Sequence, residues 1–469
     1  MSSPAESKSG IYRLRQEWPR VKRFHLVGIG GIGMSGLAEI LIRLGYDVSG
    51  SDICESQLTN RLAEMGGTIY RGHDKHHVAD TDVLVYSAAI HNDNPEVVEA
   101  RSKGILVLSR GDLLAAMVRQ GTGIAVAGTH GKSTTTGMIG VMFLDCDLDP
   151  TLIVGAVVPT IGSNVRIGEG VHVIVEADEY NRSFLQLSPD IAVLTSIDAD
   201  HLEYYGSQDA IDTAFLSFVH ALPSHRPVIA CNDDPGVCRL LPDVRRETIT
   251  YGIESAADVR ATEIILDGYT SSSTIIIGGI EAGRLILKRP GIYHISNALA
   301  AIATGNHLGL SWEEMRKSLT EFEGLKRRFE VKGEKNGITV IDDYAHHPVE
   351  VSALLRGATA GDSRIVAVFQ PHLYSRTKLF AEDFGAALAL ADVVVLTDVF
   401  PSREKPVPGV TGELIHQAVR DQGNSDVFYV GDKHQLADFV SDKLQPGDTV
   451  LTIGAGDITD VGNQILERI

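Results

Sequence analysis

The chain carries the stretch GIAVAGTHGKSTTTGM at residues 123–138. Ile124 to Ala127 is a short apolar run that favours a buried strand, and a glycine-rich turn follows it. We expect a helix to begin near Lys132. Strand, glycine-rich loop and helix in this order form a phosphate-binding loop, because glycine lets backbone N–H groups approach an anion and the helix points its positive end at the same place.

Two side chains of this loop have chemistry that suits a nucleotide. Lys132 would reach the outer phosphates, and the hydroxyl of Ser133 would reach a phosphate-bound Mg²⁺. The usual spacing G-x-x-x-x-G-K-[ST] places a glycine at position 126, where this chain has Val126. A glycine-rich turn that only caps a helix is therefore the alternative interpretation, although G-K-S-T-T after a strand is hard to explain by structure alone.

A second glycine pattern lies nearer the start of the chain. Arg23 to Val27 predicts a strand, and Gly28, Gly30 and Gly33 after it fit the spacing G-x-G-x-x-G. A helical pattern and a second strand then lead to Asp52, so the whole has the spacing of a nucleotide-binding βαβ unit with an acid about 20 residues on. Taken alone, the pattern is also compatible with NAD(P) binding or with tight helix-on-strand packing without a ligand.

Acidic residues follow two predicted strands in the middle of the chain. Residues 171–175 lead to Glu176-Ala177-Asp178-Glu179, and residues 191–194 lead to Asp198-Ala199-Asp200-His201. Ligand crevices form outside the carboxyl ends of strands in open α/β sheets. Carboxylates beside a phosphate loop suit Mg²⁺, which prefers oxygen ligands. A helix cap or a solvated turn is the alternative for an acidic pair of this kind.

The length of 469 residues is enough for about three domains. We predict an α/β fold with a Rossmann-like N-terminal domain at 1–119, a central P-loop ATPase domain with a parallel-rich sheet at 120–326, and a Rossmann-like α/β C-terminal domain at 327–469. Short alternating segments between residues 259 and 287 predict an antiparallel excursion within the central domain. In the third domain, polar groups such as DDYAHHP at 342–348 follow the predicted strands.

Composition narrows the function classes. The formal net charge of −19 argues against a nucleic-acid partner and against an anionic membrane surface. Four cysteines form neither a C-x-x-C pair nor a zinc pattern, which indicates free thiols in a reducing compartment. No apolar run approaches the length of a membrane helix, and the polar start lacks a signal core. We therefore expect a cytoplasmic protein without membrane insertion.

Seven motifs in one order resemble those of the Mur ligases of the peptidoglycan pathway: GTHGKSTTT, EADE, DADHLEYYG, GIYHISNALAA, FEGLKRRFE, DDYAHHP and FQPHLYSRT. The resemblance covers nearly the whole chain from about Arg23. Within the family, the motifs are most similar to those of members that attach L-alanine to UDP-N-acetylmuramate. The implied substrates are therefore UDP-N-acetylmuramate, L-alanine and ATP, with Mg²⁺ or alternatively Mn²⁺ as the metal and a monomer or homodimer as the assembly.

The resemblance implies an ADP-forming ligase. ATP would phosphorylate the lactyl carboxylate of the sugar nucleotide, and the amine of L-alanine would attack the acyl phosphate. A carboxylate is a poor electrophile until it is phosphorylated, so the protein contributes positioning and neutralisation of charge. The G-x-G-x-x-G pattern would then serve a uridine diphosphate and not NAD.

The resemblance also implies roles for individual residues. Catalytic roles fall to Lys132, His201, His347 and Arg376. ATP would be bound by Gly128, Thr129, His130, Gly131, Lys132, Ser133, Thr134, Asn297, Arg328 and Asp343. The UDP-sugar would be bound by Gly28, Gly30, Gly31, Gly33 and Asp52, and the amino acid by Tyr344, His346, His347 and Arg376. The metal ligands would be Ser133, Glu176 and His201.

The sequence departs from the family pattern at a few positions. Tyr293-His294 replaces a common His-Asn pair before the NALAA segment, Leu373 stands where an additional Arg is frequent, and Asn181 stands where Asp is common. The nearest alternative function is the recycling ligase of the same family, which joins a preformed peptide to the same sugar nucleotide. An NAD-dependent enzyme or a nucleotide-switch protein is the alternative from another class, but it leaves DDYAHHP without a role.

Overall fold

The computed structural model describes residues 10–199, 202–359, 361, 363–402 and 404–469. The chain divides into two compact units. The first comprises the described residues up to 262 together with 275–283 and 296–322, and the second comprises 263–274, 284–295 and 323–469. Among the described residues, no helix is long and apolar enough to cross a membrane.

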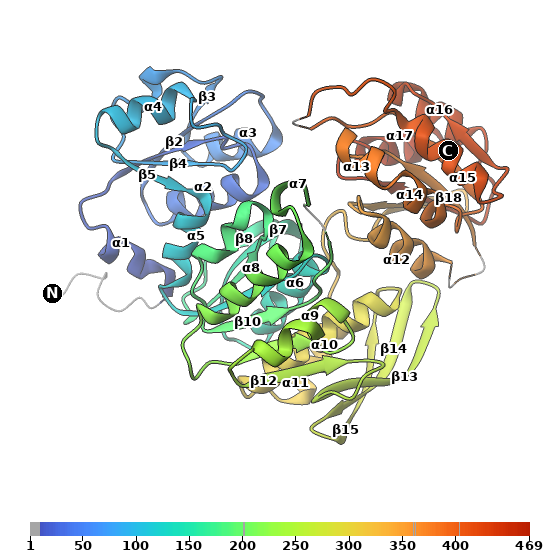
Figure 1. Ribbon diagram of the computed structural model, residues 1–469, viewed down its shortest axis with the longest axis horizontal. Coiled ribbons are helices and arrows are strands. Elements are labelled where there is room, and N and C mark those ends of the chain that lie inside the picture. Colours follow the sequence, from blue (N-terminus) through green and yellow to red (C-terminus); the bar gives the residue numbers. More distant parts are fainter. Residues whose placement is uncertain (1–9, 200–201, 360, 362, 403) are drawn as a thin grey trace. The chain divides into compact units, whose positions relative to one another are not determined.

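The first sheet, in blue to cyan in Figure 1, has five parallel strands in the order β3-β2-β1-β4-β5. The strands are β1 (Arg23–Val27), β2 (Asp47–Asp52), β3 (Thr68–Arg71), β4 (Val83–Tyr86) and β5 (Leu106–Ser109), and the helices are α1 (Leu14–Glu17), α2 (Ile32–Arg43), α3 (Gln57–Glu64), α4 (Pro95–Ser102) and α5 (Arg110–Val118). The order reverses between β1 and β4, the switch point at which nucleotides bind in such sheets. The predicted βαβ unit is therefore present.

A ten-stranded sheet occupies the middle of the chain, in the order β15-β14-β13-β12-β11-β10-β6-β9-β7-β8. Its strands are β6 (Thr122–Ala127), β7 (Thr151–Val158), β8 (Ser163–Arg166), β9 (His172–Ala177), β10 (Ile191–Leu194), β11 (Val228–Cys231), β12 (Thr248–Gly252), β13 (Val259–Asp267), β14 (Thr270–Ile277) and β15 (Ile280–Leu287). From β13 to β7 all pairings are parallel. Loops at 268–269 and 278–279 join β13, β14 and β15, as expected for the predicted antiparallel excursion, because only antiparallel neighbours can be joined by two residues.

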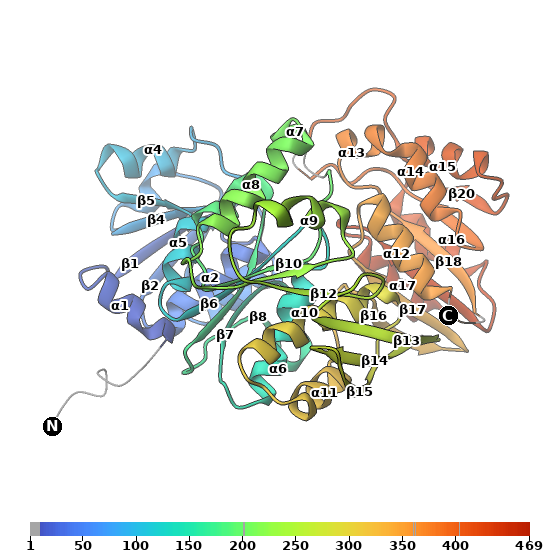
Figure 2. The same cartoon turned by 60° about the horizontal axis from the view of Figure 1, so that its bottom comes forward.

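Helices cover both faces of the central sheet. Figure 2 shows α8 and α9 on one face and α6, α10 and α11 on the other. These elements, with the short α7, are α6 (Lys132–Asp145), α7 (Leu202–Tyr205), α8 (Gln208–His220), α9 (Pro235–Leu240), α10 (Ile292–His307) and α11 (Trp312–Glu321). Residues 133–143 of α6 are all buried, so the helix that follows the phosphate loop is a core element.

One apolar core runs through the first two sheets. Leu113 and Met117 of α5 belong to the same buried cluster as Phe184 and Phe215 of the central sheet's covering segments. The rings of Phe184 and Phe215 lie 5.1 Å apart. The described residues up to 119 and most of the predicted domain at 120–326 therefore belong to one compact unit with shared buried apolar surface, whereas 263–274, 284–295 and 323–326 belong to the second unit.

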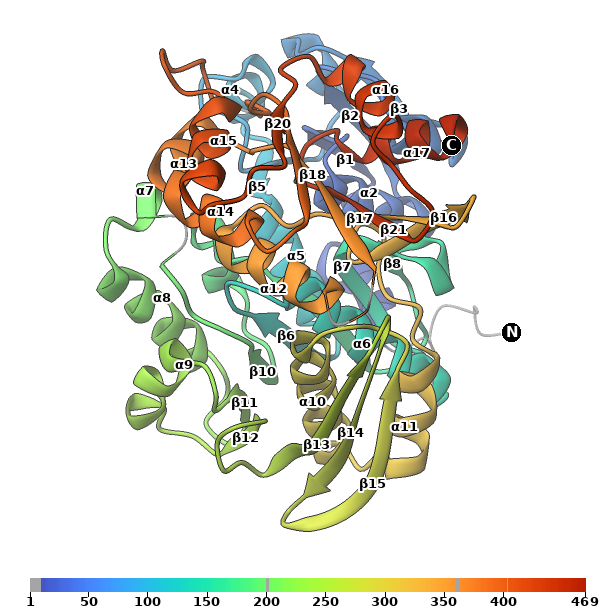
Figure 3. The same ribbon diagram turned by 90° about the vertical axis from the view of Figure 1, so that its right-hand side faces the viewer.

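The third sheet has the order β16-β17-β21-β18-β19-β20. Its strands are β16 (Glu330–Lys335), β17 (Ile338–Asp343), β18 (Arg364–Phe369), β19 (Val393–Leu396), β20 (Val427–Tyr429) and β21 (Asp448–Ile453), and its helices are α12 (Pro348–Ala358), α13 (Tyr374–Leu379), α14 (Ala381–Leu388), α15 (Gly412–Asp421), α16 (Leu436–Ser441) and α17 (Thr459–Arg468). Only β16 runs antiparallel to its neighbour. Figure 3 shows α12, α14 and α15 on one face and α16 and α17 on the other.

Burial on both faces explains the apolar runs that predicted these strands. Ile341 and Leu451 pack under α12 and α14, whereas their neighbours Val340 and Val450 pack under α16 and α17. Strands covered on both sides have no solvent face and so carry few polar residues. The predicted α/β fold class is confirmed, and the domain boundaries at 119/120 and 326/327 remain predictions.

Candidate active site

The phosphate loop joins β6 to α6 at residues 128–131. Gly128 has φ +145°, and a Cβ there would lie 2.0 Å from Oγ1 of Thr195. Gly131 has φ +79°, and a Cβ there would lie 2.6 Å from Oδ1 of Asn297. Both positions therefore require glycine. Val126 is buried inside β6, so the missing glycine of the usual spacing falls in the strand and not in the loop.

The segment after the neighbouring strand β10 holds the loop in place. The backbone N–H of Thr129 donates to the carbonyl of Ser196 (2.8 Å), and that of His130 donates to the hydroxyl of Ser196 (2.9 Å). The hydroxyl of Thr195 donates to the carbonyl of His130 at 2.5 Å. The sequence patterns did not single out Thr195 and Ser196, although these residues follow a strand that ends at the same sheet edge as β6.

Lys132 is nearly buried, and its ammonium contacts the first two residues of the loop and Glu179. Its Nζ donates to the carbonyls of Gly128 (2.5 Å) and Thr129 (3.1 Å), and it lies 2.9 and 2.8 Å from the two carboxylate oxygens of Glu179. Burial lowers the pKa of Lys132, but the charges of Glu179, Asp178 and Glu176 outweigh this and raise the pKa above its ordinary value. The lysine is therefore an ammonium at neutral pH. Its partner Glu179 was part of the predicted acidic cluster, but the sequence assigned it no role.

The backbone beyond Glu179 is held in an uncommon conformation. Asn181 and Arg182, in the 3-10 segment Tyr180–Gln186, have φ values of 54° and 53°. The hydroxyl of Tyr205 donates to the carbonyl of Glu179 at 2.6 Å. Left-handed backbone at residues other than glycine costs about 1 kcal/mol or more and persists where the surroundings impose it. Asn181, where the family often has Asp, suits this conformation because asparagine tolerates it well.

Two of the three predicted metal ligands are oxygen donors near Lys132. Ser133 lies in the first turn of α6, and Glu176 lies in β9, where its Oε2 accepts a hydrogen bond from the N–H of Gly155 at 2.7 Å. Glu176 and Asp178 are close enough to act on the charge of Lys132. This donor set fits Mg²⁺, which keeps several waters and binds substrate phosphates through only one or two protein carboxylates. The third predicted ligand, His201, lies outside the described residues.

The glycine fingerprint forms a loop closed by Asp52. The N–H of Gly28 donates to the carbonyl of Ser51 (2.8 Å), and the N–H of Gly30 donates to Oδ2 of Asp52 (2.8 Å). A Cβ at Gly30 would lie 2.9 Å from the same oxygen. Gly31 is the N-cap residue of α2, so the loop delivers the positive end of a twelve-residue helix to the switch point of the sheet.

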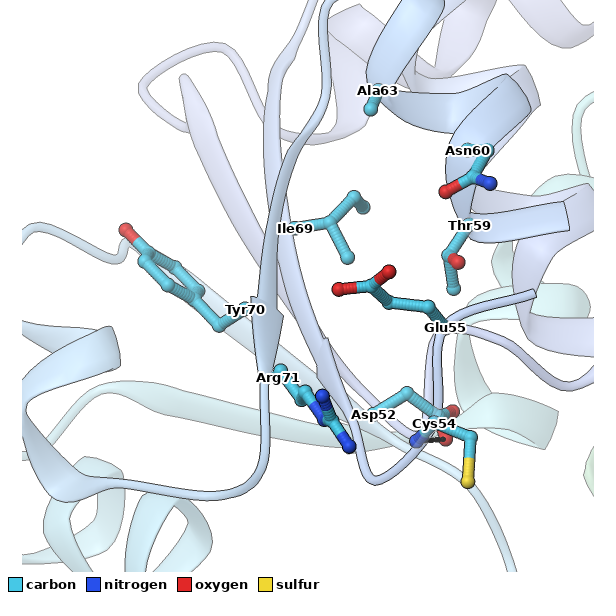
Figure 4. Close-up of a pocket in the computed structure, with 9 residues that line it drawn as sticks. All are labelled: Asp52, Cys54, Glu55, Thr59, Asn60, Ala63, Ile69, Tyr70 and Arg71. Atoms are coloured by element: carbon cyan, nitrogen blue, oxygen red, sulfur yellow. Dashed lines mark hydrogen bonds between the residues drawn. The ribbon is translucent and has the colours of Figure 1, made fainter. Parts of the chain in front are cut away.

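A pocket opens beside this loop, at the ends of β2 and β3. Its volume is about 100 Å³. Figure 4 shows Glu55 and Thr59 from the β2–α3 side facing Ile69 of β3, with Arg71 at the rim. The complete lining is Asp52, Cys54, Glu55, Thr59, Asn60, Ala63, Ile69, Tyr70 and Arg71. The sequence patterns identified only Asp52 of this set, because α3 and β3 are short and partly exposed and bury few apolar residues.

In the second unit, Asp343 is the last residue of β17, and its carboxylate holds two neighbouring backbone segments. Its two carboxylate oxygens accept hydrogen bonds from the N–H groups of Phe329 (2.7 Å) and Ala345 (2.8 Å). Burial raises the pKa of Asp343 to about 6, although the charge of Arg328 opposes the rise. The guanidinium carbons of Arg327 and Arg328 lie 4.9 and 5.2 Å from the ring centroid of Tyr344.

The two histidines predicted to bind the amino-acid substrate come shortly after Asp343 in the sequence. His346 Nδ1 lies 3.0 Å from the carbonyl oxygen of Tyr344, and the rings of His346 and His372 are 5.8 Å apart. His347 is buried at the N-cap of α12. Arg376 is buried in α13, just beyond the end of β18. Because β17, β21 and β18 are adjacent and parallel, the segments that follow them lie at the same edge of the sheet.

Two departures from the family pattern are structural. Leu373 has φ +68°, is buried and accepts the hydrogen bond of Thr377 N–H at 3.0 Å through its carbonyl, so it sets the start of α13. His294 Nδ1 lies 2.7 Å from the carbonyl oxygen of Pro290, and burial lowers the pKa of His294 to about 3. Hence His294 is neutral and fastens the first turn of α10.

The structure therefore assembles the predicted residues in two groups. The phosphate loop with Glu176 and Asn297 lies in the first unit, and Arg328, Asp343, Tyr344, His346, His347 and Arg376 lie in the second. Asn297 contacts the first turn of α6, where its Oδ1 accepts a hydrogen bond from Oγ1 of Thr135 at 3.2 Å. The individual roles of these residues remain predictions.

Three family models match consecutive parts of the chain. The model described as "Mur ligase family, catalytic domain" matches residues 23–122, "Mur ligase middle domain" matches 126–305, and "Mur ligase, glutamate ligase domain" matches 327–456.

Known proteins resemble the chain over nearly its full length. The UDP-N-acetylmuramate--L-alanine ligases of Geotalea daltonii and Geobacter sp. strain M21 are 44% and 45% identical and cover 96% of this chain, which covers 98% of each. The crystal structure of the UDP-N-acetylmuramate-alanine ligase of Thermotoga maritima matches with a TM-score of 0.83 at 30% identity, covering 96% of this chain and 99% of that one. A murein peptide ligase from Psychrobacter arcticus matches with a TM-score of 0.71 at 25% identity, covering 95% of this chain and 98% of that one.

Proposed function

Because this chain belongs to the Mur ligase family, we propose that it is an ADP-forming ligase that joins L-alanine to the lactyl carboxylate of UDP-N-acetylmuramate in peptidoglycan precursor synthesis. The observation that carries the proposal is the phosphate loop, in which a charged Lys132 lies between two loop carbonyls and Glu179. This arrangement suits the transfer of a phosphoryl group, since positioning and charge neutralisation supply most of the catalysis.

Lys132 stabilises the negative charge that develops on the transferred phosphoryl oxygens. Ser133 and Glu176 would hold Mg²⁺, which when bound neutralises phosphate charge. The amino acid binds through its ionic ends, because L-alanine offers little apolar surface. Arg376 binds its carboxylate with a planar pair of donors. The product of the first step is an acyl phosphate at the lactyl carboxylate, and the free amine of L-alanine displaces phosphate from it.

The neutral His294 and the buried Leu373 take no part in this scheme. The recycling ligase remains the second candidate, because the chain also resembles a murein peptide ligase. The L-alanine ligases are nevertheless the more similar relatives, at 44–45% identity against 25%. A cytoplasmic location belongs to the proposal and is supported by four cysteines that are all free thiols.

A phosphate-release assay tests the function. Purified protein is mixed with ATP, Mg²⁺ and UDP-N-acetylmuramate, and L-alanine, glycine, L-serine or the preformed tripeptide is added in turn. We expect release that depends on the sugar nucleotide and is fastest with L-alanine. Release only with the tripeptide would identify the recycling ligase. Lys132→Ala serves as the inactive control, with its circular dichroism spectrum compared to that of the unmutated protein.

A further inference from the structure

Arg110 is fixed at the first position of α5, between two functional segments of the first unit. Ser109 caps the helix, because its hydroxyl accepts the N–H of Asp112 (3.1 Å) while Oδ2 of Asp112 accepts the N–H of Ser109 (2.8 Å). A Cβ at Gly111 would lie 1.8 Å from Oε1 of Gln186, so the start of α5 packs tightly on the segment that follows Glu179. The backbone of Arg110 is therefore held without help from its own side chain.

The guanidinium of Arg110 touches the glycine fingerprint on one side. A Cβ at Gly33 would lie 3.1 Å from Nη1 and 3.4 Å from Cδ of Arg110. The absence of a side chain at Gly33 thus makes room for this cation beside the first turn of α2. That turn belongs to the loop expected to receive the diphosphate of the sugar nucleotide.

On its other side the guanidinium meets the acidic segment of the ATP site. Nη2 of Arg110 lies 3.1 Å from Oδ2 of Asp178. The next residue, Glu179, pairs with Lys132 of the phosphate loop. Arg110 therefore lies between the loop expected to hold the sugar nucleotide and the loop expected to hold ATP, where the lactyl carboxylate must lie to accept a phosphoryl group.

The ion pair by itself does not explain the arginine. Its two side chains are 22% and 38% exposed, and a partly exposed pair of this kind contributes only about 0–1 kcal/mol to stability. A guanidinium has five N–H donors, and one hydrogen bond to Asp178 leaves it able to grip a carboxylate or a phosphate with two parallel bonds.

We propose that Arg110 binds an anionic oxygen group of the sugar nucleotide, either its diphosphate or its lactyl carboxylate, while Asp178 orients the guanidinium. This inference rests on the proposed function. It adds a substrate-binding residue that lies outside every motif noted in the sequence, on the helix that links the first two sheets.

Equilibrium binding by calorimetry tests the inference with three probes: UDP-N-acetylmuramate, UDP-N-acetylglucosamine, which lacks the lactyl carboxylate, and UDP. We expect Arg110→Ala to weaken the binding of UDP-N-acetylmuramate by tenfold or more. Arg110→Lys should restore part of the affinity because it keeps the charge. A loss of affinity for all three probes would show that Arg110 binds the diphosphate. A loss of affinity for UDP-N-acetylmuramate alone would show that Arg110 binds the lactyl carboxylate.

Two further variants separate binding from structure. Asp178→Asn removes the charge of the partner but keeps the arginine and an amide oxygen that can still orient it, so affinity should remain within threefold. Arg119→Ala removes a comparable ion pair, 3.0 Å from Glu17, at the other end of α5, and should change nothing. Unchanged affinity in Arg110→Ala, or an equal loss in Asp178→Asn, overturns the inference. Failure of the unmutated protein to bind UDP-N-acetylmuramate would instead refute the proposed function.

Discussion

Lys132 is charged and little exposed to water, so it needs a counter-ion. Glu179 is that counter-ion when no nucleotide is bound. The pair is nearly buried on both sides, with side chains 13% and 5% exposed. Phosphates that approach Lys132 must compete with the carboxylate of Glu179 for the same ammonium. We therefore expect Glu179 to oppose nucleotide binding while it stabilises the free protein.

Replacing Glu179 by glutamine should separate these two effects. Leaving Lys132 without its charged partner should lower the free energy of unfolding of the nucleotide-free protein by ~3 kcal/mol. ATP should then raise the melting temperature of Glu179→Gln by more than that of the unmutated protein, since a neutral amide competes less with phosphate. Differential scanning calorimetry with and without Mg-ATP measures both. The exposed Glu313→Gln is the control, and an equal ATP-induced rise in both proteins would contradict the competition.

We expect Arg376 to contribute to the binding of the amino-acid substrate. A hydrogen bond to a charged group contributes about 1.5–3 kcal/mol, so Arg376→Ala should raise the KM for L-alanine by about 10- to 100-fold. The KM for ATP should change by less than about threefold, because the phosphate loop lies in the other unit. Steady-state phosphate release with one substrate varied at a time decides this. Equal rises in both KM values would instead place Arg376 at the phosphates.

At the scale of elements, a buried carboxylate ties four segments of the N-terminal sheet together. Glu96 of α4 accepts a hydrogen bond from Ser51 of β2 (2.6 Å) and contacts His73 (3.0 Å), His77 (2.6 Å) and His25 of β1 (3.4 Å). The carbonyl of the same Ser51 accepts the N–H groups of the glycine loop. The cluster is therefore connected to the glycine loop through Ser51.

This cluster should make the stability of the N-terminal domain depend on pH. Burial alone would raise the pKa of Glu96, but hydrogen bonds from His25, Ser51 and His77 outweigh it and lower the pKa to about 2. A lowered pKa means that the carboxylate stabilises the fold above its ordinary value of 4.5, and that this contribution disappears as the pH falls toward 2. The contribution at neutral pH is about 3 kcal/mol at most.

Glu96→Gln should therefore unfold at lower urea concentration than the unmutated protein at pH 7, and the difference should shrink between pH 4.5 and the most acid pH that the protein tolerates. Trp18, whose ring lies 5.8 Å from that of Phe24, reports on this domain when Trp312 of α11 is replaced by phenylalanine. A difference in urea midpoint that is independent of pH would show that the charge of Glu96 contributes nothing.

At the scale of the whole molecule, the predicted site is divided between two compact units. The phosphate loop belongs to the first, and Asp343, Tyr344 and Arg376 belong to the second. Amide formation needs the acyl phosphate and the amine in one place and needs water excluded from the acyl phosphate. If residues of both units act in the proposed reaction, we expect substrate binding to bring them to one reacting centre.

We expect ATP and UDP-N-acetylmuramate together to reduce the radius of gyration measured by small-angle X-ray scattering, since closure of domains over substrates is the usual way to exclude water. Either ligand alone should have a smaller effect. Lys132→Ala, which cannot hold the nucleotide phosphates in the same way, should show a weaker response. Superimposable scattering profiles for the free and the doubly bound protein would argue against closure.

Much of the fold follows from local patterns in the sequence. The strands Arg23–Val27 and Ile191–Leu194 have the predicted bounds, because a strand buried on both faces is apolar along most of its length. The phosphate loop was predictable for a similar reason, since Gly128 and Gly131 adopt backbone conformations that few other residues reach. The short α3 and the half-exposed β3 were missed because each is brief and buries few apolar residues: α3 buries Thr59 and Leu62, and β3 has no fully buried residue.

The partners of the charged residues were decided by the tertiary structure. Glu179 lies 47 residues from Lys132, and Asp178 lies 68 residues from Arg110. Each pair meets because β9 lies beside β6 in the sheet and α5 packs on the segment after β9. The sequence determines which residues carry charge and which segments form strands. The choice of partner depends on the order of strands in the sheet, which is set by the burial of apolar surface over the whole domain and leaves no local mark near either residue.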